Sequence, residues 1–351
     1  MKKLIALFLA GVMALSLVAC GGSKTEEKKE ETKTETTETT EAASYKVGFT
    51  LNSSINDGGW GTACYNDLLA AIEKTPGWEL AYTDNLPQDG YYDAMVAYCN
   101  AGVDLIYAPG GEYTDAVLQV AAEYPDVAFA LLNGSEETPA AAVNGNVTCL
   151  LPNAQQIGWI AGALAGLMSE TGTIAFIGGM ELTTTLAKYE GFCEAAKYTA
   201  EQEGKTVIAL DPVYANSWDD ASKGIELANA MIEQGADVFF GDASAVDSGA
   251  RQAIDEHNAA VGAIEVYDIA QPADFLGQNE CIIGSQVTDN SNLIALSFKA
   301  VEDGSFGGEV LYGDLQNGVL SAGALNDLIP AEKQEKYTAY IQQIVDGTFM
   351  K

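Results

Sequence analysis

From residue 45 onward, short apolar runs with strand character alternate with segments of helical periodicity. The first strand-like runs are at residues 45–51, 79–83, 104–108, 128–133 and 147–151. Helical patterns lie between them at residues 62–74, 90–101 and 114–124. Strands and helices that alternate through short turns form parallel sheets with helices on both faces. The alternation therefore predicts an α/β fold with a doubly wound parallel sheet.

The same alternation restarts after residue 152, which predicts a second doubly wound lobe of similar size. It opens with a helix at residues 153–169, where Gly158, Gly162 and Gly166 recur at four-residue spacing. This spacing places the glycines along one stripe of the helix, where they allow close packing on a neighbouring element. Further strand-like runs are at residues 173–177, 206–210, 237–240, 262–267 and 281–287.

The order of these segments predicts two lobes joined by hinge crossings. We expect the N-terminal lobe to contain residues 44–151 with about 288–325, and the C-terminal lobe residues 152–287 with about 326–351. Within the later segment, residues 310–320 are expected to form an antiparallel excursion. Closure of two lobes around a ligand is a common use of such a hinge.

The N-terminal segment is expected to be a lipoprotein signal peptide, residues 1–20. Two lysines precede an apolar run at residues 4–18 that is too short for a comfortable membrane span. The motif Leu-Val-Ala-Cys ending at Cys20 resembles a bacterial lipobox, in which that cysteine is lipidated; the alternative is an ordinary signal peptide with an incidental cysteine. Residues 21–43 are rich in Thr, Glu and Lys, and predict a disordered tether.

Charge and composition exclude several classes of function. Lys and Arg total 17 against 50 Asp and Glu, a formal net charge of −33, so nucleic acid and anionic lipid are repelled. Arg251 is the only arginine and His257 the only histidine, so we expect no phosphate channel lined by arginines, no metal site and no cofactor. The common nucleophile, Walker, dinucleotide and zinc-protease motifs are missing, and we expect no enzyme.

Beyond Cys20, an odd number of cysteines remains, so at least one must be free. They lie within apolar periodic runs, which favours buried thiols that act as small apolar residues over disulfides. The five positions are Cys64, Cys99, Cys149, Cys193 and Cys281.

Two strand-to-helix loops carry the features of a binding site. Residues 52–61 include Trp60, and residues 216–220 include Trp218 in an equivalent position of the second lobe. Open α/β sheets bind ligands at the carboxyl ends of their strands. We predict that the two indole rings sandwich a flat solute between the lobes, each stacked contact contributing about 0.5–1.5 kcal/mol beyond burial. The alternative is that each ring caps its own helix or packs into its own core.

Polar residues near the strand ends are the candidate ligand anchors. In the first loop, Asn56 offers an amide and Asp57 a carboxylate for charge-assisted hydrogen bonds, although Asp is also a preferred helix N-cap. Asp268 follows the run at 262–267 and is either an anchor or a turn residue. Asp242 is a third acid at a strand end. Gly110 offers backbone N–H groups, or forms a plain turn.

Three pairs of segments resemble the basic membrane protein family of ABC-transporter substrate-binding lipoproteins, which includes the purine nucleoside receptors. They are residues 104–110 with 124–130, 177–180 with 189–192, and, most specifically, 218–224 with 234–238. The resemblance covers residues 45–347 and implies a type I periplasmic-binding fold that captures a nucleoside or nucleobase for a membrane permease.

By the same resemblance, Asp57 is the loop acid, Trp60 and Trp218 are the stacking aromatics, and Asp268 binds ribose. The chain departs from the nucleoside receptors in two places. It has Gly-Trp ending at Trp60 where they show Phe-Asn, and residues 285–288 lack their lysine. These departures keep a free purine base, or another planar solute, open as the ligand.

Together these features predict a monomeric lipoprotein of an ABC importer, anchored through lipid on Cys20 to the outer face of the bacterial cell membrane. The expected partners are a small planar solute and a membrane permease. Two alternatives remain: a sugar receptor of the same fold, because indole rings also stack on pyranoses, and a surface lipoprotein that acts as an adhesin or sensor subunit.

Overall fold

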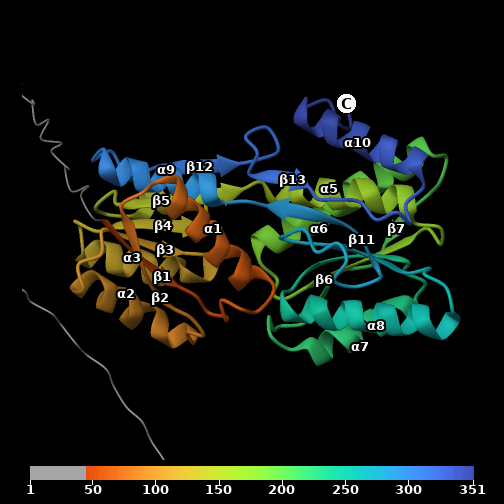
Figure 1. The fold of residues 1–351 in the computed structure, drawn as a ribbon, viewed down its shortest axis with the longest axis horizontal. Helices are drawn as coiled ribbons and strands as arrows, with labels where there is room; N and C mark the ends of the chain where they lie inside the picture. The colour runs from red at the N-terminus through yellow and green to blue at the C-terminus, as the bar shows by residue number, and fades with distance from the viewer. Residues whose placement is uncertain (1–44) are drawn as a thin grey trace, which may run out of the picture. The chain divides into compact units, whose positions relative to one another are not determined.

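A computed structural model describes residues 45–351 of the chain. The predicted signal peptide, its lipidation site Cys20 and the predicted tether at 21–43 lie outside the described residues. The described part contains two sheets that belong to one compact unit (Figure 1). Among its helices, none is long and apolar enough to span a membrane.

The first sheet has six strands in the order β12-β5-β4-β3-β1-β2, all parallel. Strands β3 and β4 are buried along their whole length, because helices cover both faces of the sheet. The strands are β1 (Tyr45–Thr50), β2 (Trp78–Thr83), β3 (Leu105–Ala108), β4 (Ala128–Leu132), β5 (Val147–Pro152) and β12 (Val310–Gly313). The helices between and beside them are α1 (Trp60–Lys74), α2 (Tyr91–Asn100), α3 (Thr114–Glu123), α4 (Thr138–Ala141) and α9 (Ser291–Glu302).

The second sheet has the order β13-β11-β10-β9-β6-β7, with β8 also paired to β6, and only β13 runs antiparallel. Its strands are β6 (Thr173–Gly178), β7 (Ile208–Ala209), β8 (Val213–Tyr214), β9 (Val238–Asp242), β10 (Tyr267–Ala270), β11 (Ile282–Thr288) and β13 (Leu320–Ala322). Its helices are α5 (Ala154–Met168), α6 (Thr183–Gln202), α7 (Ala221–Glu233), α8 (Ala245–Val261) and α10 (Ala331–Val345).

Two short strands correct the expectation of an antiparallel excursion at residues 310–320. Strand β12 pairs in parallel with β5 and extends the first sheet. Strand β13 is antiparallel to β11 and belongs to the second sheet, although its residues were expected in the N-terminal lobe. The chain therefore passes from one sheet to the other between β12 and β13, in addition to the passages after β5 and after β11.

Strand β10 begins at Tyr267, later than the expected run at 262–267. Helix α8 continues to Val261 and ends at Gly262, whose φ of 76° lies in the left-handed region that favours glycine. Asp268 is consequently an internal strand residue rather than the residue that follows the strand.

The glycine stripe of α5 packs against α6, as the spacing predicts. A Cβ atom added to Gly158, Gly162 or Gly166 would lie 2.2 Å from the carbonyl oxygen of Lys188, Phe192 or Ala196, respectively. Such distances are far below normal van der Waals contact, so only glycine permits this approach of the two helix backbones.

The five cysteines of the described residues are free thiols, which confirms the preference for unpaired cysteines. Four of them are buried and Cys193 is partly buried. Burial raises the pKa of each thiol, so these side chains behave as small apolar groups at neutral pH.

Candidate ligand-binding site

A cavity of about 620 Å³ lies between the two sheets and is lined by residues from both. This volume falls within the range of ligand pockets, which is about 300–1,000 Å³. The lining comes largely from loops and helix starts at the carboxyl ends of the parallel strands, where open α/β sheets bind ligands. Four of the predicted site residues line it, namely Trp60, Gly110, Trp218 and Asp242.

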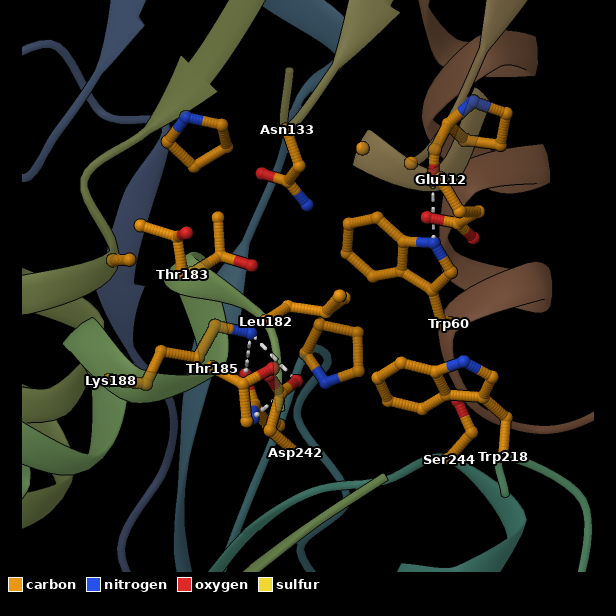
Figure 2. A pocket seen from close by; sticks show the side chains of 18 of the residues that line it. Trp60, Glu112, Asn133, Leu182, Thr183, Thr185, Lys188, Trp218, Asp242 and Ser244 are labelled. Atoms are coloured by element: carbon orange, nitrogen blue, oxygen red, sulfur yellow. Dashed lines mark hydrogen bonds and ion pairs between the residues drawn. The ribbon is translucent and has the colours of Figure 1, made fainter. Parts of the chain in front are cut away.

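Both predicted indole rings face the cavity (Figure 2). Trp60 is the first residue of α1, and its Nε1–H donates to the carbonyl of Pro109 at 2.9 Å, which fixes the ring. Trp218 rests on Gly179, where an added Cβ would lie 2.2 Å from the indole. In Figure 2 the two rings lie toward one side of the cavity and Lys188 toward the other.

Asp57 does not line the cavity, which corrects its expected role as a direct anchor. Its carboxylate accepts from the backbone N–H groups of Gly59, Gly61 and Thr62 at 2.8–3.0 Å and from the hydroxyl groups of Ser53 and Thr62, each at 3.0 Å. These are the free donors at the start of α1, so Asp57 acts as the helix-capping residue that was the alternative.

Asn56 is exposed and also lies outside the residues that line the cavity. From the same loop it is Asn52 that lines the cavity, and its Nδ2 donates to Glu112 Oε1 at 2.8 Å. Burial raises the pKa of the Glu112 carboxyl group. Gly110 leaves room for this carboxylate, because an added Cβ would lie 2.2 Å from Glu112 Oε2.

Asp242 is held in a polar network at the second-lobe side of the cavity. Its Oδ1 lies 2.8 Å from Lys188 Nζ, and its Oδ2 accepts from the Thr185 hydroxyl at 2.9 Å. Gln271 donates to Asp242 Oδ1 at 3.2 Å and accepts from Lys188 at 3.1 Å. The carboxylate is thus positioned and neutralised by neighbours before any ligand binds.

Asp268 is buried behind the cavity and does not line it, which corrects its expected contact with ribose. Because it lies inside β10, its side chain points toward α8, where its Oδ2 accepts from Arg251 Nε at 2.8 Å. Arg251 does line the cavity, and so does the neighbouring Asp247, whose pKa burial raises to about 7.

The sequence interpretation missed Lys188, Arg251, Asp247 and Glu112 as residues of the site. The first three lie within helices, where a charged residue is typical of an exposed face. The available signal was that Lys188 shares one stripe of α6 with the buried Thr185 and Phe192.

Comparisons with known proteins agree with this architecture. A family model described as ABC transporter substrate-binding protein PnrA-like, named Bmp, matches residues 44–349. The chain belongs to the Bmp family. The predicted resemblance is thereby confirmed, and the family is one of solute-binding proteins rather than of enzymes.

Individual relatives and solved structures are similar to this chain over most of their length. Transcriptional activator protein med of Bacillus subtilis is 26% identical, over 85% of this chain and 87% of that protein. Basic membrane protein B of Borreliella burgdorferi is 22% identical, over 97% and 99%. A solute-binding protein of an ABC transporter system from Aeropyrum pernix has a TM-score of 0.73 at 19% identity, over 86% and 92%. The structural likeness confirms the predicted two-lobed type I periplasmic-binding fold.

Proposed function

We propose that this Bmp protein is an extracytoplasmic lipoprotein, anchored through Cys20, that captures a purine nucleoside or nucleobase for an ABC permease. The observation that carries the proposal is the cavity between the lobes, which is lined by one indole ring from each lobe. A flat heteroaromatic ring gains most from such surfaces, because stacking adds to the burial of its faces.

The polar groups around the indoles support a ligand with several hydrogen-bonding edges. Glu112 and Asn52 face the cavity from the first lobe, and Asp242 and Lys188 from the second. A purine ring carries donors and acceptors around its rim, so one ring can satisfy groups from both lobes at once. This arrangement favours lobe closure, because the ligand then makes contacts that neither lobe makes alone.

A sugar is the second candidate ligand, and one observation favours it. Charged and amide side chains that the sequence analysis did not assign to the site, among them Arg251, Lys188 and Asn52, line the cavity. Such side chains form hydrogen bonds with the hydroxyl groups of a pyranose, whose apolar face stacks on an indole ring.

A thermal-shift screen with purine nucleosides, free bases and monosaccharides tests the proposal. A ligand that binds the folded state raises the unfolding midpoint by mass action. We expect nucleosides or bases to raise it in a concentration-dependent way, with monosaccharides inactive at the same concentrations. Stabilisation by sugars alone would replace the first candidate by the second, and no stabilisation by either class would favour an adhesin or sensor subunit.

A further inference from the structure

The single arginine of the chain is buried against the ligand cavity. The side chain of Arg251 is 8% exposed, and the residue lines the cavity from the second turn of α8. Two contacts fix the plane of its guanidinium group. Its Nε–H donates to Asp268 Oδ2 at 2.8 Å, and its Cζ lies 5.3 Å from the centre of the Phe275 ring.

These contacts use one of the five N–H donors of the guanidinium group. The two terminal amino groups have no hydrogen-bond acceptor among residues 45–351. Within the described residues, the side-chain polar atoms that are fully enclosed and unpaired do not include these two amino groups. The amino groups of Arg251 are therefore accessible. Arg251 therefore offers the cavity a rigid fork of donors, and donors that face a cavity without a protein partner favour a ligand that supplies acceptors.

The charges around the fork indicate what kind of acceptor fits. Burial alone lowers the pKa of Arg251, but Asp268 and Asp247 together raise it above its usual value, so the guanidinium stays charged. The Asp247 carboxylate is buried beside the fork, with Oδ2 accepting from the Ala243 N–H at 2.9 Å. Asp268 already balances the charge of the guanidinium group, and Asp247 adds negative charge when it is ionised, so a phosphate or carboxylate of the ligand would add to an excess of negative charge. Neutral acceptors carry no such penalty.

Lys188, the other cation that lines the cavity, adds no free positive charge that would attract an anionic ligand. Its ammonium group forms an ion pair with Asp242 at 2.8 Å and also donates to Gln271. The charge of each cation is thus already balanced by a carboxylate of the protein, which favours neutral bases and nucleosides over nucleotides.

We propose that Arg251 makes the cavity selective for 6-oxopurines, such as guanine, hypoxanthine and their nucleosides. A 6-oxopurine presents O6 and N7 side by side as acceptors in one plane, which matches two parallel N–H donors of a guanidinium group. Adenine presents an amino donor in place of O6 and cannot satisfy the same fork. This inference rests on the proposed function and names the substrate class of the same cavity.

Titration calorimetry of the full-length protein in detergent tests the inference with guanosine, inosine, adenosine and 7-deazaguanosine, which lacks the N7 acceptor. For the wild-type protein we expect guanosine and inosine to bind at least about tenfold more tightly than the other two. Arg251→Lys keeps the charge and loses the fork. The preference of this variant for guanosine and inosine over adenosine and 7-deazaguanosine should therefore shrink to within about threefold. Gln252→Ala, an exposed neighbour on α8, is the control and should keep the wild-type preference.

The outcomes separate the inference from the proposed function. If adenosine and 7-deazaguanosine bind the wild-type protein as tightly as guanosine, the role of Arg251 is refuted and purine capture stands. If Arg251→Lys folds and keeps the full preference, the inference is also refuted. If that variant does not fold, the double variant Arg251→Gln with Asp268→Asn takes its place, because it removes the fork together with the charge of its ion-pair partner, and a full preference in this variant also refutes the inference. If no purine binds, the proposed function fails and the inference fails with it.

Discussion

In the glycine stripe of α5, replacing glycine with alanine should destabilise the protein, which is the opposite of the usual effect in helices. Replacing a helical glycine with alanine ordinarily stabilises a protein by up to about 1 kcal/mol. In Gly158→Ala the new Cβ would lie 2.2 Å from the Lys188 carbonyl oxygen and 2.6 Å from the Phe192 nitrogen. Both are backbone atoms of α6, so the clash is relieved only if the two helices move apart.

The expected cost follows from that geometry. Real Cβ contacts essentially never fall below 3.0 Å, so the backbones must separate by most of an ångström along a tightly packed interface. Overpacking costs about 1–3 kcal/mol, and a clash with rigid backbone belongs at the upper end of that range. After subtraction of the gain in helix propensity, we expect Gly158→Ala to lower the free energy of unfolding by about 2 kcal/mol.

Urea denaturation of Gly158→Ala beside Gly90→Ala measures this difference. Gly90 is the N-cap of α2 with helical backbone angles, and its added Cβ would lie 3.6 Å or more from the atoms packed around it, so this control should change the free energy of unfolding by less than about 1 kcal/mol. A Gly158→Ala protein as stable as the wild type would refute the hypothesis that only glycine permits the close approach of α5 to α6. Because Lys188 lies at the clash, the variant should also weaken ligand binding.

Three further predictions address the site and its surroundings. Trp60→Ala and Trp218→Ala should each weaken ligand binding at least about tenfold, about 1.4 kcal/mol, in titration calorimetry; unchanged affinity in both would contradict stacking. Burial raises the pKa of Asp67 from 3.8 to about 7, so the folded protein keeps this proton to a higher pH than the unfolded chain does. The free energy of unfolding should therefore fall as pH rises from about 4 to about 7, and Asp67→Asn should flatten this slope in urea titrations at several pH values. If Asp67→Asn left the pH dependence of the free energy of unfolding unchanged, the pKa of Asp67 would not be raised in the folded protein. Lys188→Met removes the ion-pair partner of the partly buried Asp242 carboxylate, which keeps its hydrogen bonds from Thr185 and Gln271, and should cost about 1–3 kcal/mol, most of which the additional change Asp242→Asn should restore. A double variant no more stable than the single one would show that the ion pair is not the cause.

Much of the fold follows from local patterns, because buried parallel strands are continuous apolar runs and their helices have clear periodicity. The short strands β12 and β13 do not follow from such patterns. Each has only three or four residues, and each pairs with a strand distant in sequence. Their orientation depends on tertiary packing, which no local window contains.

The site was predictable where a residue type is unusual for its surroundings. Trp60 and Trp218 are large aromatics in polar loops, and both line the cavity. Asp57 and Asp268 were misassigned because a position near a strand end does not determine where a side chain points. Asp57 points back to the start of the helix that follows it. Asp268 forms an ion pair with Arg251, and helical periodicity alone does not show that Arg251 faces β10.

The capping role of Asp57 has a consequence for how quickly a ligand is captured. The loop before α1 is cross-braced by its own hydrogen bonds, and Trp60 at its end is tied to the Pro109 carbonyl. The ring is therefore preorganised, which reduces the entropy that this loop loses on association. We therefore expect the arrival of the solute to be limited by diffusion, so that differences in affinity between solutes appear in their residence times.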